Sequence, residues 1–468
     1  MQLQECARGR MRSAGGGALF QAPGSSLTAV GKPPIRLAAS GLILGLLASV
    51  LSAAEPPSLK FTFGSAPAAG WSRVTPEMSF NPERGFGFEP GATVVAHPSF
   101  ASSDRPFLFS VAVPEGNYLV TVTLGGSPAS ASEATVKSES RRLMLERVVT
   151  PAGKTEKRTF AVNVRNAKVP PPPLNAPGND HVELNNRENS PANGLVYHWD
   201  DKLTLEFNGA QPALSALEIV AAPQLPTVFL AGDSTVTDQP REPGASWGQM
   251  LPRFLKPSVA VANHAESGET LKSFITELRL DKMLSQIKRG DWLFIQFSHN
   301  DQKQNWPQTY VEAATTYRAY LRVFIAEARR RGATPVLVTP MQRRQFDDAG
   351  KIRNSHGDYP AAVREVARED GVALIDLERA SVAFYEALGP EKSPLAFSGG
   401  GRDPTHHNSY GAYQLAKCVI AGLRAAKLDL AAHIVEDFAG FDPARPDAPE
   451  TFSLPASPGR TNQAPRGN

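Results

Sequence analysis

The chain has 468 residues, enough for two or three domains that each bury a core. With 41% hydrophobic and 20% charged residues, its composition is that of an ordinary globular protein. The formal net charge is +3, but five basic residues and one acidic residue fall in the first 54 positions, leaving −1 for the rest. This near-neutral remainder excludes the strongly basic surface expected of a partner of nucleic acid or anionic membranes.

The first 54 residues predict a secretory signal peptide. Two basic residues precede an apolar run at 37–50, and small residues follow at 52–54. The run is shorter than the roughly 20 residues a membrane-spanning helix needs. We expect cleavage and a secreted or periplasmic protein, with no membrane contact afterwards; retention as an uncleaved anchor is the alternative. Because the polar stretch before the basic residues is long, the true start could also be Met11 or a later position.

The two cysteines, Cys6 and Cys418, exclude an internal disulfide in the exported protein, since Cys6 would leave with the leader. Cys418 lies in an apolar helical stretch, which predicts buried packing in preference to a reactive thiol. The spacing also lacks the paired cysteines of a structural zinc site.

Residues 55–223 predict a β-sandwich. Short alternating runs at 107–113, 118–124, 158–164, 203–207 and 216–220 are separated by Gly, Pro, Asn and Ser. The sequence Pro114-Glu-Gly-Asn between the first two runs predicts a hairpin. The proline-rich stretch 170–173 predicts a surface loop.

From Pro226 the pattern changes to alternating strands and helices. Strands are predicted at 227–231, 259–262, 292–297, 335–339 and 372–376, and helices at 271–288, 310–331, 359–369 and 409–427. This alternation predicts a parallel sheet covered on both faces, over residues 226–437. The Pro-rich, polar residues 438–468 predict a mobile tail.

Four short segments supply the groups that acyl transfer needs. They are Gly232-Asp-Ser234, Gly268, Asn300 within Ser-His-Asn-Asp, and Asp403-Pro-Thr-His406. The first three follow predicted strands, so they meet at one edge of the sheet, and the last precedes the final helix. Ser234 is the candidate nucleophile, His406 its base and Asp403 the group that orients His406, while Gly268 and Asn300 can donate to an oxyanion. Taken singly, each has a structural alternative: a turn serine, a packed histidine or a capping aspartate.

These segments resemble the SGNH (GDSL-type) hydrolase superfamily, and within it the rhamnogalacturonan acetylesterase family. The resemblance rests on Gly-Asp-Ser-Thr at 232–235, Ser-His-Asn-Asp at 298–301, and the stretches 331–340 and 403–413, and it spans 226–427. It implies a three-layer α/β/α flavodoxin-like fold and the absence of a cofactor or metal. It further implies that the backbone N–H groups of Ser234 and Gly268, with the Asn300 side chain, form the oxyanion hole. Relatives often have Arg at the position of Glu269. This departure leaves the prediction of the substrate-binding side of the site open, but not that of the catalytic residues.

Residues 81–88 resemble the galactose-binding-like (jelly-roll) sandwich that precedes this hydrolase domain in some bacterial relatives. Such sandwiches either bind sugar or only pack against their neighbour. Trp71, Phe86 and Phe88 are accordingly either stacking platforms or buried aromatics, and burial is favoured.

Two groups of histidines carry weaker hypotheses. His356 either lines the pocket or lies in a polar surface loop, and the surface loop is favoured. His264 with His299 and Asp301 could suggest a metal site, but an oxyanion hole already serves to polarise a carbonyl.

The sequence thus predicts a serine esterase that removes acetyl groups from an acetylated plant cell-wall polysaccharide or oligosaccharide, such as rhamnogalacturonan. One alternative is another acyl-ester hydrolase on the same scaffold, such as a lipase, thioesterase or xylan acetylesterase. The other is a catalytically silent carbohydrate-binding protein.

Overall fold

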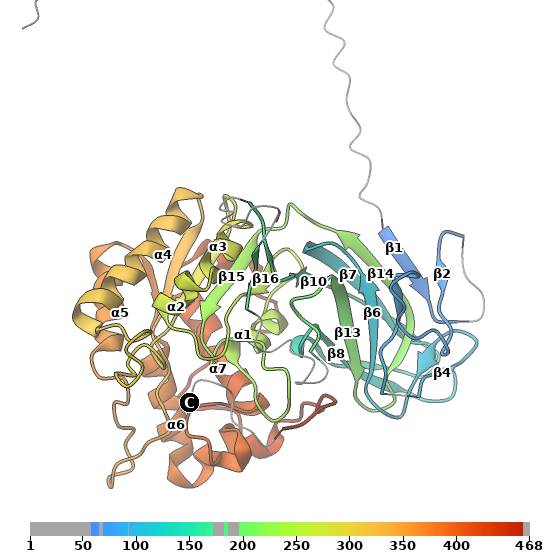
Figure 1. The fold of residues 1–468 in the computed structure, drawn as a ribbon. Coiled ribbons are helices and arrows are strands. Elements are labelled where there is room, and N and C mark those ends of the chain that lie inside the picture. The colour runs from blue at the N-terminus through green and yellow to red at the C-terminus, as the bar shows by residue number, and fades with distance from the viewer. Residues whose placement is uncertain (1–57, 65–68, 92, 172–181, 186–195, 462–468) are drawn as a thin grey trace, which may run out of the picture. The chain divides into compact units, whose positions relative to one another are not determined.

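The computed structural model of the protein describes residues 58–64, 69–91, 93–171, 182–185 and 196–461. The predicted signal peptide and Cys6 lie outside these residues. Within the described part of the chain, no helix is long and apolar enough to cross a membrane. Figure 1 shows the chain from the strand-rich N-terminal region to the helices and strands that follow it.

The N-terminal region folds into two sheets that face each other. The first sheet has the order β10-β7-β14-β1-β2, with β5 pairing to β14 and β4 to β5, and the second has the order β3-β6-β13-β8-β9. The bounds in the first sheet are β1 Ser58–Thr62, β2 Ser72–Arg73, β4 Val95–Ala96, β5 Ala101–Ser102, β7 Gly116–Gly125, β10 Thr155–Val164 and β14 Ala213–Ala221. Those in the second are β3 Phe86–Phe88, β6 Phe107–Ala112, β8 Ser132–Ser138, β9 Arg142–Thr150 and β13 Lys202–Asn208. A separate pair joins β11 Lys168–Val169 to β12 Val182–Glu183.

The sandwich core follows from the two-residue period of its strands. In β7 the alternate residues Tyr118, Val120, Val122 and Leu124 are buried, and they share one apolar cluster with residues of the opposite sheet such as Phe109. The predicted β-sandwich is therefore confirmed. Phe88 is buried and Phe86 packs against the same core, so neither ring is an exposed stacking platform.

The predicted hairpin at Pro114 is wrong. β6 pairs with β3 and β13, whereas β7 pairs with β10 and β14 of the other sheet. The short connection therefore carries the chain across the core from one layer to the other. Its turn residues suit either connection, and the apolar residues of both runs fit either sheet, so local sequence could not distinguish the two.

The C-terminal region has a five-stranded parallel sheet of order β16-β15-β17-β18-β19. Its strands are β15 Thr227–Gly232, β16 Ala260–Asn263, β17 Trp292–Gln296, β18 Thr334–Val338 and β19 Ala373–Ile375. In chain order the strands run 2-1-3-4-5 across the sheet, which is the flavodoxin-like arrangement. The predicted parallel sheet and fold class are confirmed.

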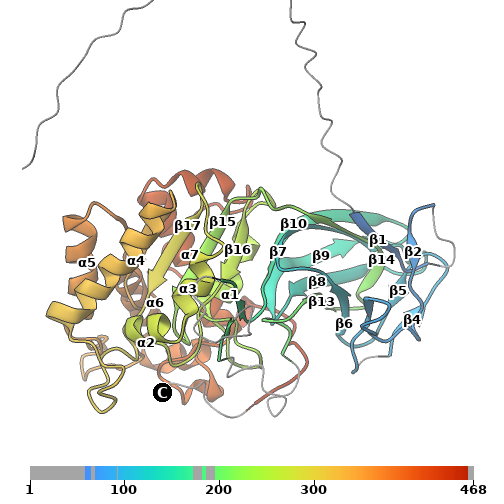
Figure 2. The same ribbon diagram turned by 45° about the horizontal axis from the view of Figure 1, so that its top comes forward.

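Helices cover both faces of this sheet (Figure 2). The α-helices are α1 Trp247–Met250, α2 Leu271–Thr276, α3 Arg279–Leu284, α4 Arg318–Arg330, α5 Tyr359–Glu369, α6 Leu377–Lys392 and α7 Ser409–Ala425. Short turns of other helix types are η2 Leu251–Phe254, η3 Ala313–Tyr317, η4 Ser393–Ala396, η5 Gly399–Gly401, η6 Asp429–His433 and η7 Pro449–Thr451. Helices α1, α6 and α7 share one apolar cluster with Val228 and Leu230 of β15, and α2 to α5 share another with Phe229 and Ala231. Because β15 is buried on both faces, it appears in the sequence as a continuous apolar run.

Two predicted helices differ in the structure. The helix expected at 271–288 breaks into α2 and α3 at Leu278, whose φ of 62° is left-handed. The helix expected at 310–331 begins with a π-helical turn, Ala313–Tyr317, before α4. Helix α6 was not predicted from the sequence; it starts at the capping residue Asp376 and contains Pro390 near its end.

The described part of the C-terminal segment contacts both regions. Tyr410 Oη donates to the Asp447 carbonyl at 2.6 Å, and Lys137 Nζ of the sandwich donates to the Pro455 carbonyl at 2.8 Å. The limits at 54, 223 and 437, and the mobility of the tail, stay predictions.

Candidate active site

Ser234 lies just beyond the carboxyl end of β15, at the edge where sites form in parallel sheets. The chain turns there because Asp233 Oδ1 accepts hydrogen bonds from the Thr235 backbone N–H at 2.9 Å and the Thr235 hydroxyl at 2.7 Å. Gln296 Nε2, at the end of β17, donates to Thr235 Oγ1 at 2.8 Å. The turn is thus attached to the neighbouring strand β17. This attachment holds the backbone of Ser234, from which the side chain extends, in one position.

His406 joins Ser234 to Asp403 in one hydrogen-bonded series. The Ser234 Oγ lies 2.8 Å from His406 Nε2, and His406 Nδ1 lies 2.8 Å from Asp403 Oδ2. The other carboxylate oxygen of Asp403 accepts from the backbone N–H groups of Thr405 at 2.8 Å and His406 at 3.0 Å. The Asp-x-x-His spacing therefore lets a single carboxylate orient both the loop and the imidazole.

The carboxylate of Asp403 is held in its ionised form. Burial raises its pKa, but the bond and charge of His406 and the two backbone N–H groups outweigh burial and lower the pKa below its usual value. An ionised Asp403 keeps the His406 proton on Nδ1. Nε2 is then free to accept the proton of the Ser234 hydroxyl.

The predicted oxyanion donors come together from the loops after β15, β16 and β17. The Gly268 loop is tied to β15, the strand that precedes Ser234, by the Glu266 N–H, which donates to the Gly232 carbonyl at 3.2 Å. On its other side, Asn300 Nδ2 donates to the Glu269 carbonyl at 3.0 Å. Gly268 has a φ of 87°, a conformation that favours glycine.

Two backbone N–H groups at this edge remain available for a ligand. Among the described residues, neither the Ser234 N–H nor the Gly268 N–H donates a hydrogen bond. The amide of Asn300 has a second N–H beyond the one bonded to Glu269. Together they have the chemistry of a three-donor oxyanion site.

Glu269, the departure from the family pattern, is buried under the Gly268 loop. Its Oε2 accepts from Ser273 Oγ at 2.6 Å, and its Oε1 lies 3.5 Å from Arg279 Nε. Arg279 also lies 3.2 Å from Glu266 Oε2. Helix α3 thus brings a guanidinium to this loop, and Glu269 positions the loop from within the protein.

The loop that carries His356 is largely exposed, as predicted, but the imidazole itself is buried in the protein. His356 is fully buried, with Nε2 2.9 Å from the Met341 carbonyl and Nδ1 3.1 Å from Ser298 Oγ. It packs edge-to-face against His299, whose Nδ1 lies 3.3 Å from Asp233 Oδ2. Burial lowers the pKa of both imidazoles, so the two rings support the Ser298–Asn300 turn as neutral groups.

His264 serves as packing. Its ring lies edge-to-face on Trp199, at 5.2 Å between centroids, and 5.6 Å from Phe229. In the portion of the chain that the structure describes, no group of three or more His, Cys, Asp or Glu side chains is arranged to hold a metal ion. Cys418 is buried and unpaired, which confirms its predicted packing role.

Sequence reasoning missed several residues that position the site. Gln239 Nε2 donates to the Ser234 carbonyl at 2.6 Å, and Lys303 Nζ donates to Asn300 Oδ1 at 3.0 Å. Arg343 Nη2 donates to the His299 carbonyl at 3.1 Å. Glutamine and lysine in loops carry no motif, so only the proximity of Lys303 to Asn300 in the sequence could have suggested its contact.

Comparison with known proteins gives this geometry a family context. A model of the GDSL-like Lipase/Acylhydrolase family matches residues 230–413. Rhamnogalacturonan acetylesterase RhgT of Bacillus subtilis (strain 168) is 41% identical over 221 residues, covering 44% of this chain and 94% of that protein. The uncharacterized esterase YxiM of the same organism is 28% identical over 397 residues, covering 80% of this chain and 92% of that protein. The crystal structure of YxiM covers 80% of this chain at 24% identity, with a TM-score of 0.44.

The matched residues 230–413 include Ser234, Gly268, Asn300, Asp403 and His406, and the relative that is 41% identical is matched over nearly its whole length. The chain belongs to the GDSL-like (SGNH) hydrolase family, with rhamnogalacturonan acetylesterases among its homologues, and it is a carboxylic ester hydrolase.

Proposed function

We propose that the protein is a carbohydrate O-acetylesterase that acts through an acetyl-Ser234 intermediate. The observation that carries the proposal is the pair of 2.8 Å contacts that join Ser234, His406 and Asp403. This is the geometry in which a neutral imidazole can take a proton from a serine hydroxyl while a carboxylate stabilises the resulting imidazolium.

In the first half of the reaction, Ser234 Oγ attacks the acetyl carbonyl carbon as its proton passes to His406 Nε2. The carbonyl oxygen becomes an oxyanion, which accepts hydrogen bonds from the Ser234 and Gly268 N–H groups and the Asn300 amide. When the tetrahedral intermediate collapses, the bond to the sugar oxygen breaks. His406 then returns its proton to that oxygen, which leaves as a hydroxyl.

In the second half, water attacks the acetyl-Ser234 carbonyl and gives one proton to His406. Collapse of the second tetrahedral intermediate breaks the bond to Ser234 Oγ, which recovers the proton from His406, and acetate is released. In each half of the cycle one proton passes through His406, while the second proton of the water leaves with the acetic acid product and is released to solvent when acetate forms.

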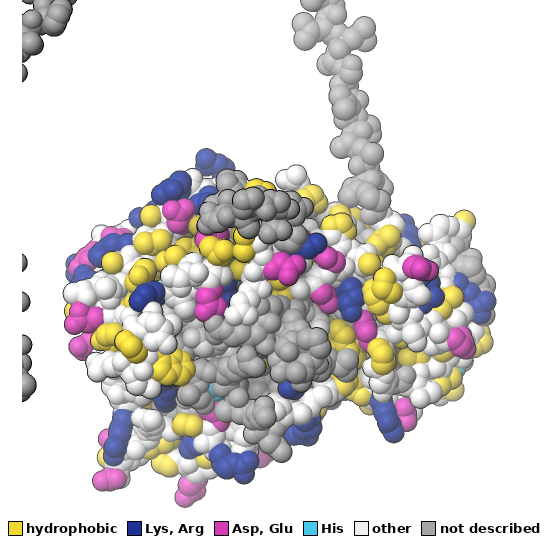
Figure 3. Space-filling model, viewed as in Figure 1, with side chains coloured by type: hydrophobic (Ala, Val, Ile, Leu, Met, Phe, Trp, Pro, Cys, Tyr) yellow, Lys and Arg dark blue, Asp and Glu magenta, His cyan; other side chains and the backbone are white. Residues whose placement is uncertain are grey.

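The proposed substrate is an acetylated pectic polysaccharide or oligosaccharide such as rhamnogalacturonan. The support is the match to one homologue named a rhamnogalacturonan acetylesterase and one named a probable rhamnogalacturonan acetylesterase, which are 41% and 40% identical over nearly their whole length. The charges of the described surface are compatible with this partner: on the face shown in Figure 3, basic and acidic side chains are interspersed. An abundant external polymer also fits secretion, which we propose from the leader's basic residues and its apolar run at 37–50.

The test is acetate release by wild type and Ser234→Ala on acetylated rhamnogalacturonan, acetylated xylan and a small aryl acetate. We expect the highest kcat/KM on the pectic polymer, and a loss of about 10⁴-fold or more on mutation. A preference for acetylated xylan would contradict the proposed substrate while leaving the mechanism. Activity of Ser234→Ala equal to wild type would overturn the mechanism, and sugar binding without hydrolysis would favour a silent binding protein.

A further inference from the structure

The segment that contains and follows Ser234, residues 233–246, is held by the sandwich. Arg141, in the turn between β8 and β9, is 5% exposed. Its Nη1 donates to the Gln239 carbonyl at 3.0 Å and to the Gly244 carbonyl at 2.7 Å, and its Nη2 lies 2.6 Å from Glu242 Oε1. One sandwich side chain therefore fixes three points of this segment.

Gln239 passes this constraint on to Ser234. Its backbone carbonyl accepts from Arg141, while its side-chain Nε2 donates to the Ser234 carbonyl at 2.6 Å. Gln249 adds a second tie, since its Nε2 donates both to the Gln239 carbonyl at 2.9 Å and to the Ser140 carbonyl of the sandwich at 2.7 Å. The position of the Ser234 backbone thus depends on groups more than 90 residues earlier in the chain.

A second set of contacts ties the same segment to the strand that precedes the Gly268 loop. Asp238 is fully buried, and its Oδ2 lies 3.1 Å from Arg142 Nε and 2.9 Å from Arg165 Nη2. Its Oδ1 accepts from Asn263 Nδ2 at 2.9 Å, at the end of β16. Two sandwich arginines and one catalytic-domain amide therefore meet on a single carboxylate.

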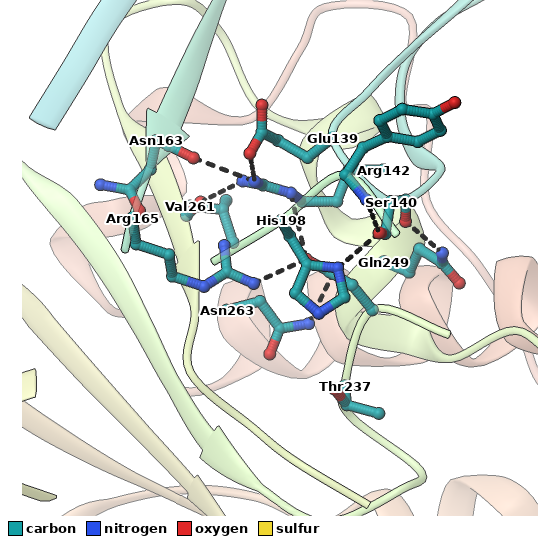
Figure 4. Close-up of polar contacts among 12 residues, drawn as sticks. Glu139, Ser140, Arg142, Asn163, Arg165, His198, Thr237, Gln249, Val261 and Asn263 are labelled. Carbon is teal, nitrogen blue, oxygen red and sulfur yellow. Dashed lines mark hydrogen bonds and ion pairs between the residues drawn. The ribbon is translucent and has the colours of Figure 1, made fainter. Parts of the chain in front are cut away.

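Figure 4 shows Arg142, Arg165 and Asn263 of this cluster, with Arg142 directed toward Asn163 and Val261. Arg142 Nη1 donates to the Val261 carbonyl of β16 at 3.2 Å. Below the cluster, Thr237 Oγ1 donates to the Ala265 carbonyl at 2.8 Å. The segment after Ser234 and the chain leading to Gly268 are therefore held to each other and to the sandwich.

We propose that Arg141 of the sandwich is a positioning residue for the esterase reaction, acting through Gln239 on the backbone of Ser234. The proposal rests on the proposed function of Ser234. Carbon–oxygen bond formation and oxyanion binding both depend on sub-ångström placement of Ser234, so loss of this support lowers kcat without removing any substrate contact. The sandwich is then part of the catalytic unit.

A matched control exists in Lys282 of α3, a fully buried cation that also crosses between the two regions. Its Nζ donates to Glu115 Oε2 at 2.8 Å, Asn166 Oδ1 at 3.3 Å and the Lys168 carbonyl at 2.5 Å. Among the described residues, Lys282 makes no hydrogen bond or ion pair with residues 233–246. Lys282→Met therefore shows how kcat and Tm change when a buried cation between the two regions is lost without any change in the contacts of residues 233–246.

The experiment measures kcat, KM and Tm on an aryl acetate for wild type, Ser234→Ala, Arg141→Met, Arg141→Lys and Lys282→Met, at a temperature where all are folded. We expect Arg141→Met to lower kcat by at least about tenfold with KM within about twofold, and Arg141→Lys to recover part of the loss. Lys282→Met should lower Tm and keep kcat within about twofold of wild type. Equal kcat losses in Arg141→Met and Lys282→Met, or full kcat in folded Arg141→Met, would overturn the proposal.

Gln239→Met provides the second route if Arg141→Met fails to fold, because it removes the donor to Ser234 and keeps the carbonyl that Arg141 holds. It should lower kcat to a similar degree, and Arg141→Lys with Gln239→Met should lose less than the product of the single losses. Full kcat in folded Gln239→Met, or multiplicative losses, would contradict the pathway through Gln239. An inactive wild type, or an active Ser234→Ala, would instead overturn the proposed function and this inference with it.

Discussion

Lys303 Nζ donates a hydrogen bond of 3.0 Å to Asn300 Oδ1, while Asn300 Nδ2 donates at 3.0 Å to the Glu269 carbonyl. The ammonium of Lys303 can bond only to the oxygen of the Asn300 amide, so its hydrogen bond defines which way the amide faces. The second N–H of the Asn300 amide is thereby directed to the edge of the site. Lys303 is in turn supported by Trp306, whose ring centroid lies 4.5 Å from the ammonium.

Replacement of Lys303 by Met should therefore lower kcat by about tenfold, with little change in KM. The lost bond is charge-assisted, and such bonds contribute about 1.5–3 kcal/mol. Steady-state kinetics on an aryl acetate checks this, with Lys351→Met as control, since Lys351 is exposed and pairs with Glu386. Equal kcat values in Lys303→Met and wild type would show that the amide orientation does not depend on Lys303.

Asp403→Asn should lower kcat by on the order of 10³–10⁴-fold while leaving the loop in place. The amide oxygen can still accept from the Thr405 and His406 N–H groups, but a neutral group no longer stabilises the imidazolium. Asp376→Asn is the control, because Asp376 is a carboxylate that caps α6 and pairs with Arg364 outside the site. That control should lose stability and retain kcat. An Asp403→Asn enzyme within tenfold of wild type would exclude the orienting role.

Much of the site could be predicted because its residues stand next to strand ends and in fixed motifs. Ser234 follows a continuous apolar run, which is the pattern of a strand buried on both faces of a sheet. Asp403 and His406 are three residues apart, so their contact could be inferred from the sequence alone. Gln239 and Arg141 could not be predicted, because their contacts depend on how the sandwich packs against residues 233–246. The break at Leu278 and the crossing at Pro114 were likewise decided by tertiary packing over local pattern.

Stability should depend on the titration of Asp301, which is buried beneath α2 with Oδ1 accepting from the Leu271 N–H at 2.8 Å. Burial raises its pKa to about 8. In the unfolded chain the pKa of an aspartate is about 3.9. At a pH between these two pKa values the unfolded chain binds fewer protons than the folded protein, so the free energy of unfolding falls as pH rises. Above about pH 8 this loss is complete, because both states are then ionised.

Asp301→Asn removes that loss, since its amide oxygen still accepts from Leu271 and carries no ionisable proton. Urea unfolding near pH 5, 7 and 8 should show the variant gaining stability relative to wild type as pH rises. A stability difference that stays constant across this range would contradict the assignment of a protonated Asp301.

Cys418 should play no part in turnover. It is buried in α7, and burial raises its pKa, which suppresses the reactive thiolate. Iodoacetamide should leave the native enzyme fully active, whereas a fluorophosphonate, which reacts with activated serines, should inactivate it. Inactivation by iodoacetamide that Cys418→Ala abolishes would contradict this expectation.

Ser234 should carry the acyl group during turnover, and peptide mapping of the acetyl-enzyme can locate that group. Wild-type protein is mixed with an activated acetate ester, quenched in acid within the first turnover and digested for mass spectrometry. We expect one acetyl group on Ser234 of the wild type, which disappears when acetate is released, and none in Ser234→Ala. An acetyl group that turns over on another residue, or acetate release by Ser234→Ala at the wild-type rate, would contradict it.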